Sequence, residues 1–284
     1  MVIFKKIEDL KKYINDTSTN ESKTGFIPTM GALHSGHLSL IENAHAHGHI
    51  TICSIFLNPT QFNNRSDFEN YPTSIDADIE LLTKAKCDVL FLPDEKEIYP
   101  DGPSSVASFD FGFLDTILEG KLRPGHFKGV GQVVGRLLDI VEPDYLYLGQ
   151  KDFQQCKVIQ ELIKIRVKAN KKNTKIIICS TTRDADGLAM SSRNRRLTEP
   201  QRNLANIIYQ CLISIQTKQN SAHFNIVEKE CFDLLTAKGF KPEYIALADS
   251  RDLRILDDYE PTTPMIALIA AWIGNVRLID NMLL

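Results

Sequence analysis

The fold of this chain is organised around the stretch Pro28-Thr29-Met30-Gly31-Ala32-Leu33-His34-Ser35-Gly36-His37. An apolar run at residues 25–27 precedes it and an amphipathic run at 38–46 follows it, which predicts a strand, a tight turn and a helix. If the helix begins near His34, the imidazoles of His34 and His37 face the same side of its first turn. Such a helix end presents unpaired backbone N–H groups and a partial positive charge, so it suits a phosphate.

The composition is that of a soluble globular protein. The 284 residues are 43% hydrophobic and 24% charged, which predicts a real core in one large domain or two ordinary ones. A net charge of -3 and the lack of a long Lys/Arg run argue against a nucleic-acid or membrane-surface partner. Six cysteines without a CxxC pair indicate reduced core thiols. With no signal-peptide core and no apolar stretch near ~20 residues, we expect a cytoplasmic protein.

The first part of the chain alternates between strand and helix patterns. Strands are predicted at residues 25–27, 50–57, 89–92, 145–148 and 175–179. Helices are predicted at residues 38–46, 75–86, 133–141 and 158–167. Residues 63–74 read as a polar loop and 119–130 as a glycine-rich connection. The alternation predicts an α/β domain over residues 1–180, with a Rossmann-like, doubly wound parallel sheet.

The pattern changes after residue 180. A polar loop is predicted at residues 181–194, followed by helices at 199–215 and 224–238. Strands are predicted at 244–248, 264–272 and 276–279, with a hairpin turn at Gly274-Asn275. We therefore expect a smaller C-terminal α+β domain over residues 181–284.

Polar side chains follow three of the predicted strands. His34 and His37 follow the first, Gln61 follows the second, and Lys151 and Asp152 follow a later one. In a doubly wound sheet the ligand site lies at the carboxyl ends of the strands. The sequence therefore predicts a single active site at one sheet edge.

Several stretches resemble one family. His34 to His37 resembles the HxGH signature of the nucleotidylyltransferase superfamily. Further stretches, in family order and over nearly the whole chain, resemble the pantothenate synthetase (pantoate–β-alanine ligase) family: Pro28-Thr29-Met30-Gly31, Asn58-Pro59-Thr60-Gln61-Phe62, Leu118-Glu119-Gly120 with Arg123-Pro124-Gly125-His126-Phe127, Lys151-Asp152-Phe153-Gln154-Gln155, Asp186-Gly187-Leu188-Ala189-Met190-Ser191-Ser192-Arg193-Asn194, and Arg277-Leu278-Ile279-Asp280-Asn281.

The resemblance implies an ATP-dependent ligase. In that family, ATP adenylates the carboxylate of pantoate and releases pyrophosphate. The amine of β-alanine then attacks the acyl adenylate and releases AMP. The implied fold is a Rossmann-like domain with a smaller C-terminal lid, usually as a homodimer, and Mg²⁺ is expected to accompany ATP.

The resemblance also implies roles for individual residues. Catalytic roles on the reacting phosphates fall to His34, His37, Lys151 and Arg193. ATP binding is implied for Met30, Gly31, Ala32, Leu33, Ser35, Gly36, Gly149, Gln150, Asp152, Thr182, Met190, Ser191 and Ser192, with Asp152 toward the ribose or magnesium side. Pantoate binding is implied for Gln61 and Gln155, and no residue is assigned as a metal ligand. Cationic groups and N–H donors at these places would stabilise the charge that develops during adenylation.

The chain departs from the family pattern at two places. Gly149-Gln150-Lys151-Asp152 stands where the family usually has Gly-Glu-Lys-Asp, and Tyr71-Pro72-Thr73-Ser74 stands for Tyr-Pro-Arg-Thr. If the missing carboxylate orients Lys151 or places magnesium, ATP binding would change; if it faces only the backbone, the change is mild. Neither departure touches the reacting groups.

Alternative interpretations exist for the function and for each motif. Another nucleotidylyltransferase would keep the nucleotide in its product, and a regulatory module would bind nucleotide without turnover. Taken singly, the motifs have ordinary structural explanations: a surface ion pair for Lys151-Asp152, polar loop or helix-start residues for Gln61 and Gln155, a simple turn for 191–194, and solvated side chains for Arg123 and His126. Their joint occurrence in family order favours the ligase.

Overall fold

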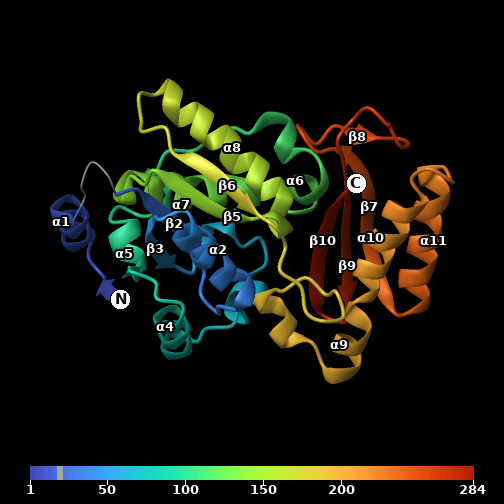
Figure 1. The fold of residues 1–284 in the computed structure, drawn as a ribbon, viewed down its shortest axis with the longest axis horizontal. Helices are drawn as coiled ribbons and strands as arrows, with labels where there is room; N and C mark the ends of the chain where they lie inside the picture. Colours follow the sequence, from blue (N-terminus) through green and yellow to red (C-terminus); the bar gives the residue numbers. More distant parts are fainter. Residues whose placement is uncertain (18–21) are drawn as a thin grey trace. The chain divides into compact units, whose positions relative to one another are not determined.

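The computed structural model describes residues 1–17 and 22–284, which form two compact units (Figure 1). The first unit comprises Met1–Gly149 and Gln154–Ser180, and the second comprises Gln150–Phe153 and Thr181–Leu284. The short segment Gln150–Phe153, which the sequence analysis assigned to the first domain, therefore groups with the second unit.

The first unit is built on a parallel sheet. In the described part of the chain this sheet has six strands in the order β1-β4-β3-β2-β5-β6, and every pairing in it is parallel. The strands are β1 Val2–Phe4, β2 Thr24–Thr29, β3 Ile50–Ile55, β4 Val89–Phe91, β5 Tyr145–Gly149 and β6 Lys175–Cys179. The order runs outward from β2 through β3 to β4, then resumes on the other side with β5 and β6. The boundary between β2 and β5 is thus the topological switch point, beyond which such sheets bind their ligands. The predicted Rossmann-like, doubly wound sheet is confirmed.

Helices cover both faces of this sheet (Figure 1). They are α1 Ile7–Thr17, α2 Ser35–Ala46, α3 Arg65–Glu69, α4 Ile75–Lys84, α5 Glu95–Ile98, α6 Leu118–Leu122, α7 His126–Val141 and α8 Phe153–Lys168. Short 3-10 segments lie between them: η1 Pro59–Gln61, η2 Pro103–Ser105 and η3 Gly112–Asp115. A further 3-10 segment, η4 Gln150–Asp152, precedes α8 in the chain and belongs to the second unit.

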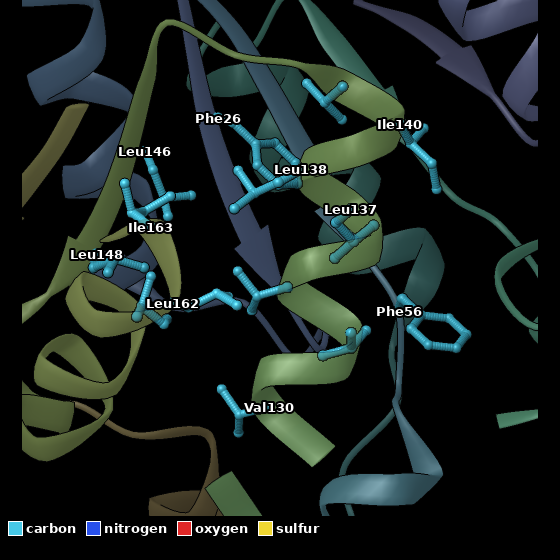
Figure 2. Close-up of a cluster of buried hydrophobic side chains, with 14 of the residues drawn as sticks. Phe26, Phe56, Val130, Leu137, Leu138, Ile140, Leu146, Leu148, Leu162 and Ile163 are labelled. Carbon is cyan, nitrogen blue, oxygen red and sulfur yellow. The ribbon is translucent and has the colours of Figure 1, made fainter. Parts of the chain in front are cut away.

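Successive strand residues face opposite layers of the core. Phe26 and Leu146 belong to a buried cluster that includes side chains of α7 and α8, as Figure 2 shows. Their chain neighbours Ile27 and Tyr147 belong to a separate cluster that includes side chains of α2 and α4. Because both faces of the sheet are buried, the strands read as continuous apolar runs rather than alternating ones.

The second unit contains an antiparallel sheet packed against helices. Its strands have the order β10-β9-β7-β8 within the described residues, and all their pairings are antiparallel. The strands are β7 Phe240–Asp249, β8 Ile255–Leu256, β9 Met265–Ile273 and β10 Val276–Leu283; the helical segments are η5 Ser192–Arg196, α9 Glu199–Ala205, α10 Ile207–Lys218 and α11 Phe224–Ala237. Helices α10 and α11 lie side by side against the sheet (Figure 1). The predicted α+β unit and the hairpin between β9 and β10 are confirmed.

Several predicted boundaries were wrong. Residues 119–130, expected as a connection, include α6 and the start of α7. Gly129 was expected as part of a loop, but it lies inside a helix. A Cβ added there would lie 2.4 Å from the Thr60 carbonyl oxygen, so this glycine allows close packing and does not form a turn. The predicted 63–74 loop contains α3, whose first turn is capped by the side chain of Asn64. The single helix expected at 199–215 is divided at Asn206.

None of the described helices is both long and apolar enough to cross a membrane.

Candidate active site

The two histidines of the opening stretch lie together at the start of α2. His34 is the N-cap residue, and its Nδ1 accepts a hydrogen bond of 3.1 Å from the backbone N–H of Gly36. The ring centroids of His34 and His37 are 4.1 Å apart. The helix follows β2, so this pair stands at the carboxyl end of the strand beside the switch point. The prediction that both imidazoles share one side of the first turn is confirmed.

The turn between β2 and α2 is held by a buried carboxylate. Gly31 has φ +82° and Ala32 has φ +49°, a left-handed conformation that favours glycine at the first position. The side chain of Asp78, only 1% exposed, accepts from the backbone N–H of Ala32 at 2.8 Å and of Leu33 at 2.7 Å. These two N–H groups, in residues predicted to bind ATP, are therefore directed at Asp78. Sequence reasoning missed Asp78 because it lies inside an ordinary helical pattern.

Gln61 joins the end of β3 to the opening stretch. It is 9% exposed, and its Nε2 donates to Sδ of Met30 at 2.9 Å. Its Oε1 accepts from Nδ2 of Asn58 at 3.2 Å. Asn58 is itself 1% exposed, and its Oδ1 accepts from the Tyr99 hydroxyl at 2.9 Å. Burial raises the pKa of Tyr99 to about 12, which keeps this phenol protonated as a donor.

The backbone of Gln61 is fixed by a buried imidazole. Nδ1 of His126 lies 2.7 Å from the Gln61 carbonyl oxygen, and Nε2 lies 3.1 Å from Nη1 of Arg123. Because a guanidinium can only donate, Nε2 is the acceptor and Nδ1 carries the proton that goes to Gln61. His126 is 5% exposed, so the interpretation of this side chain as solvated was wrong. Asn58 and His126 both stand in stretches quoted for the family resemblance, which was the signal that could have singled them out.

The two glutamines at the start of α8 differ. Gln154 is 3% exposed; its Oε1 accepts from the Glu119 N–H at 3.0 Å and its Nε2 donates to the Leu114 carbonyl at 2.8 Å. Gln155, the predicted pantoate ligand, is half-buried, and among the described residues its side chain has no hydrogen-bond partner. The amide of Gln155 is therefore available to a ligand, whereas that of Gln154 is committed to structure.

In the second unit, Lys151 lies in η4, which directly follows Gly149, the last residue of β5. Its side chain is 17% exposed, and Nζ lies 3.2 Å from Oδ1 of Asp152. The carbonyl groups of Gln150 and Lys151 both accept from Nδ2 of Asn281. The ion pair named as the ordinary structural explanation for Lys151-Asp152 is thus present, but the lysine is mostly buried, and the predicted ligand roles of both residues stay predictions.

The predicted polar loop at 181–194 is an ordered hairpin of the second unit. Arg183 and Ala189 form an antiparallel bridge, and the N–H of Met190 donates to the carbonyl of Thr182 at 3.0 Å. Ser191 caps η5 by accepting from the N–H of Arg193 at 3.3 Å. This hairpin carries five of the predicted residues: Thr182, Met190, Ser191, Ser192 and Arg193.

The predicted residues thus form two groups. Met30 to His37 and Gln61 are brought together in the first unit, where Gly149 ends β5 and Gln155 stands on α8. Lys151, its neighbours Gln150 and Asp152, and the hairpin residues belong to the second unit. The part that each plays toward a ligand stays a prediction.

A family model described as pantoate-beta-alanine ligase matches residues 2–283. This chain belongs to the pantoate–β-alanine ligase family. Among its curated relatives, the pantothenate synthetase of Aliivibrio salmonicida (strain LFI1238) is 40% identical, covering 99% of this chain and 93% of the relative. That of Cytophaga hutchinsonii is 40% identical, covering 100% of this chain and 99% of the relative.

Solved structures of pantoate–β-alanine ligases share the whole fold. The pantothenate synthetase of Thermus thermophilus superimposes with a TM-score of 0.90 at 32% identity, covering 99% of both chains. The enzyme of Francisella tularensis, described as complexed with beta-gamma ATP and beta-alanine, gives a TM-score of 0.82 at 39% identity and covers 100% of this chain and 97% of that one.

The family fixes the reaction class. As a pantoate–β-alanine ligase, the chain is an enzyme that joins pantoate to β-alanine in an ATP-dependent ligation. The resemblance stated from the motifs is confirmed, and the two alternatives, a nucleotide-retaining transferase and a module without turnover, are set aside.

Proposed function

We propose that the chain forms pantothenate in two steps, through a pantoyl adenylate made at the start of α2. The observation that carries this proposal is the pair of imidazoles of His34 and His37, with ring centroids 4.1 Å apart, at a helix N-terminus beside the switch point of the sheet. A helix N-terminus stabilises phosphate, and the switch point is where doubly wound sheets bind nucleotides.

In the first step, a carboxylate oxygen of pantoate attacks the α-phosphorus of ATP and pyrophosphate leaves. Nδ1 of His34 accepts from Gly36, so a neutral His34 carries its proton on Nε2 and donates it to a phosphate oxygen. His37 donates to the same phosphoryl group. Hydrogen bonds that strengthen as charge develops on these oxygens lower the barrier.

Two cationic side chains are proposed to act on the phosphates of ATP. Lys151 binds the ATP phosphates, and Arg193 offsets the charge of the departing pyrophosphate. The hydroxyl groups of Ser191 and Ser192 donate to phosphate oxygens, and the backbone of Thr182 contacts the adenine. These roles follow from the family resemblance; Ser191 also caps η5, the segment that carries Ser192 and Arg193.

The glutamines orient pantoate for both steps. Gln61 is held by Asn58 and, through its backbone, by His126, so its amide has a fixed direction. Gln155 offers a second amide. Neutral amides suit a substrate with two hydroxyl groups and a carboxylate, because a buried protein carboxylate would repel it. In the second step the unprotonated amine of β-alanine attacks the acyl carbon, the C–N bond forms, the bond to AMP breaks, and the nitrogen loses a proton to solvent; no protein nucleophile is required.

We propose Mg²⁺ as the companion of ATP. The described residues contain no group of three His, Cys, Asp or Glu side chains that could cage a metal. Mg²⁺ is usually bound by one or two carboxylates, water and the substrate phosphates. Asp152, with a side chain 48% exposed, would be its carboxylate, and the ion would neutralise phosphate charge.

The test is an assay with ATP and pantoate, with and without β-alanine. We expect sustained AMP release only when both acids are present, and an inert protein would contradict the proposal. His37→Ala should lower turnover by roughly 10²–10⁴-fold while the protein stays folded. His47→Ala is the matched control, because His47 is exposed at the other end of α2 and should turn over normally. A near-normal rate for His37→Ala would remove the phosphate role given to it.

Two further expectations concern assembly and location. We propose a homodimer, on the family resemblance alone, which sedimentation velocity would detect as twice the chain mass of 32.1 kDa. We also propose that the enzyme works in the cytoplasm, because all six cysteines are buried thiols without a disulfide, as expected in a reducing compartment.

A further inference from the structure

The motif Arg277-Leu278-Ile279-Asp280-Asn281 resembles the family but has no role in the mechanism above. Its last two residues lie on β10, where Asp280 is opposite Ile269 and Asn281 is opposite Leu268 on β9. Successive residues of a strand point to opposite faces of the sheet. Asp280 and Asn281 therefore reach out on different sides of β10.

On one side, Asn281 holds the segment that carries Lys151. Its Nδ2 donates to the carbonyl oxygen of Gln150 at 3.0 Å and to that of Lys151 at 2.8 Å. Its Oδ1 accepts from Nε2 of Gln150 at 3.2 Å. Asn281 is 2% exposed, and each of these side-chain hydrogen bonds goes to a residue of η4.

On the other side, Asp280 holds the hairpin that carries Arg193. Its Oδ2 lies 2.6 Å from Nη1 of Arg183 and its Oδ1 lies 3.0 Å from Nη2. Nη1 of Arg183 also donates to the Gly187 carbonyl at 3.0 Å, and the guanidinium lies 4.5 Å from the ring centroid of Tyr209. A bidentate pair of this kind fixes direction as well as distance.

We propose that Asn281 is a positioning residue for Lys151, and that Asp280 and Asn281 together hold the Lys151 segment and the hairpin of Arg193 to one strand. The ammonium of Lys151 and the guanidinium of Arg193 would then bind ATP as parts of one rigid body. The inference rests on the proposed phosphate role of Lys151. The inference also gives Gln150 a role, because its side-chain N–H donates to Oδ1 of Asn281. An ionised glutamate, the family's usual residue here, has no proton to donate.

A purely structural role for Asn281 predicts different kinetics from a positioning role. If Asn281 only satisfies two buried carbonyl groups, its loss and the loss of the Lys151 ammonium are independent and their effects multiply. If Asn281 acts through Lys151, removing it matters little once the ammonium is gone. A double-mutant cycle separates the two cases.

The experiment compares Lys151→Ala, Asn281→Ala and the double variant by kcat/KM for ATP at saturating pantoate. We expect Asn281→Ala to lose roughly 10–100-fold, and the double variant to lie within about 3-fold of Lys151→Ala. Val276→Ala is the control for general loss of stability, because Val276 is a core residue of the same strand, 3% exposed, and should leave kcat/KM for ATP unchanged.

A milder variant covers the case in which Asn281→Ala does not fold. Gln150→Leu removes only the donor to Oδ1 of Asn281, so it should raise KM for ATP by a few fold, and this effect should vanish in the Lys151→Ala background. Multiplying effects in either cycle, or a wild-type rate in the foldable Asn281 or Gln150 variant, would overturn the inference. If Lys151→Ala alone kept the wild-type rate, the proposed role of Lys151 would fail first and the inference with it.

Discussion

At the scale of single residues, Asp78 decides the shape of the turn that carries the histidine pair. Its carboxylate accepts from the N–H groups of Ala32 and Leu33, and Oδ1 also accepts from the Ser74 hydroxyl at 3.2 Å. Hydrogen bonds to a buried carboxylate are among the stronger ones in proteins, and their loss is correspondingly costly. The turn therefore depends on a residue of another helix.

We predict that Asp78→Ala lowers the free energy of unfolding by about 3 kcal/mol and also slows pyrophosphate release. The reason is that the turn loses its acceptor and the start of α2 is no longer fixed. Urea unfolding and a pyrophosphate assay measure the two effects. Asp76→Ala is the control, because Asp76 is in the same first turn of α4 but is exposed. Equal behaviour of the two variants would contradict the role assigned to Asp78.

The same residues show what sequence can and cannot predict at this scale. The pairing of His34 with His37 follows from their spacing on a helix, and it was predicted. The contact of Asp78 with Ala32 spans 46 positions, so no local pattern contains it. His126 shows the same limit, since it reaches the Gln61 carbonyl across 65 positions.

At the scale of elements, the packing of α7 against η1 positions Gln61. Gly129 allows this approach, because a Cβ there would lie 2.4 Å from the Thr60 carbonyl oxygen and 2.8 Å from Cα of Gln61. These neighbours are backbone atoms, which cannot move away from an added Cβ as easily as the end of a flexible side chain can. The sequence indicated glycine-rich structure at 119–130 but not its cause, since glycine in a loop and glycine at a close helix contact look alike in one dimension.

We predict that Gly129→Ala lowers the free energy of unfolding by about 2 kcal/mol and raises KM for pantoate, because α7 and the Gln61 turn must separate. Urea unfolding and steady-state kinetics give both quantities. Gly135→Ala in the same helix is the control. Its Cβ would lie 3.2 Å from the side chain of Phe109, a tight contact, but alanine favours helix over glycine by about 1 kcal/mol. The two effects nearly cancel, so the free energy of unfolding should change little. An unchanged KM for pantoate in a folded Gly129→Ala protein would argue against the coupling.

At the scale of the whole molecule, the alternation of strands and helices was enough to predict a parallel sheet followed by an antiparallel one. The unit to which Gln150–Phe153 belongs was not predictable, because in the sequence this segment directly follows β5, a strand of the first unit. The segment belongs to the second unit, in which the Lys151 carbonyl accepts a hydrogen bond from Asn281, 130 positions away. The sequence therefore did not show which of the predicted site residues belong to the first unit and which to the second.

The stability of the second unit should depend on acid pH through Asp249, whose side chain is 2% exposed. Hydrogen bonds from Arg251 lower the pKa of this carboxyl group to about 2. A depressed folded pKa stabilises the fold above the ordinary pKa near 3.8, and this contribution disappears as pH falls toward 2. The free energy of unfolding in urea should therefore fall less steeply between pH 4 and 2 in Asp249→Asn than in the wild type. Asp257→Asn is an exposed control and should keep the wild-type dependence on pH. An unchanged dependence on pH in Asp249→Asn would show that this carboxylate does not govern acid unfolding.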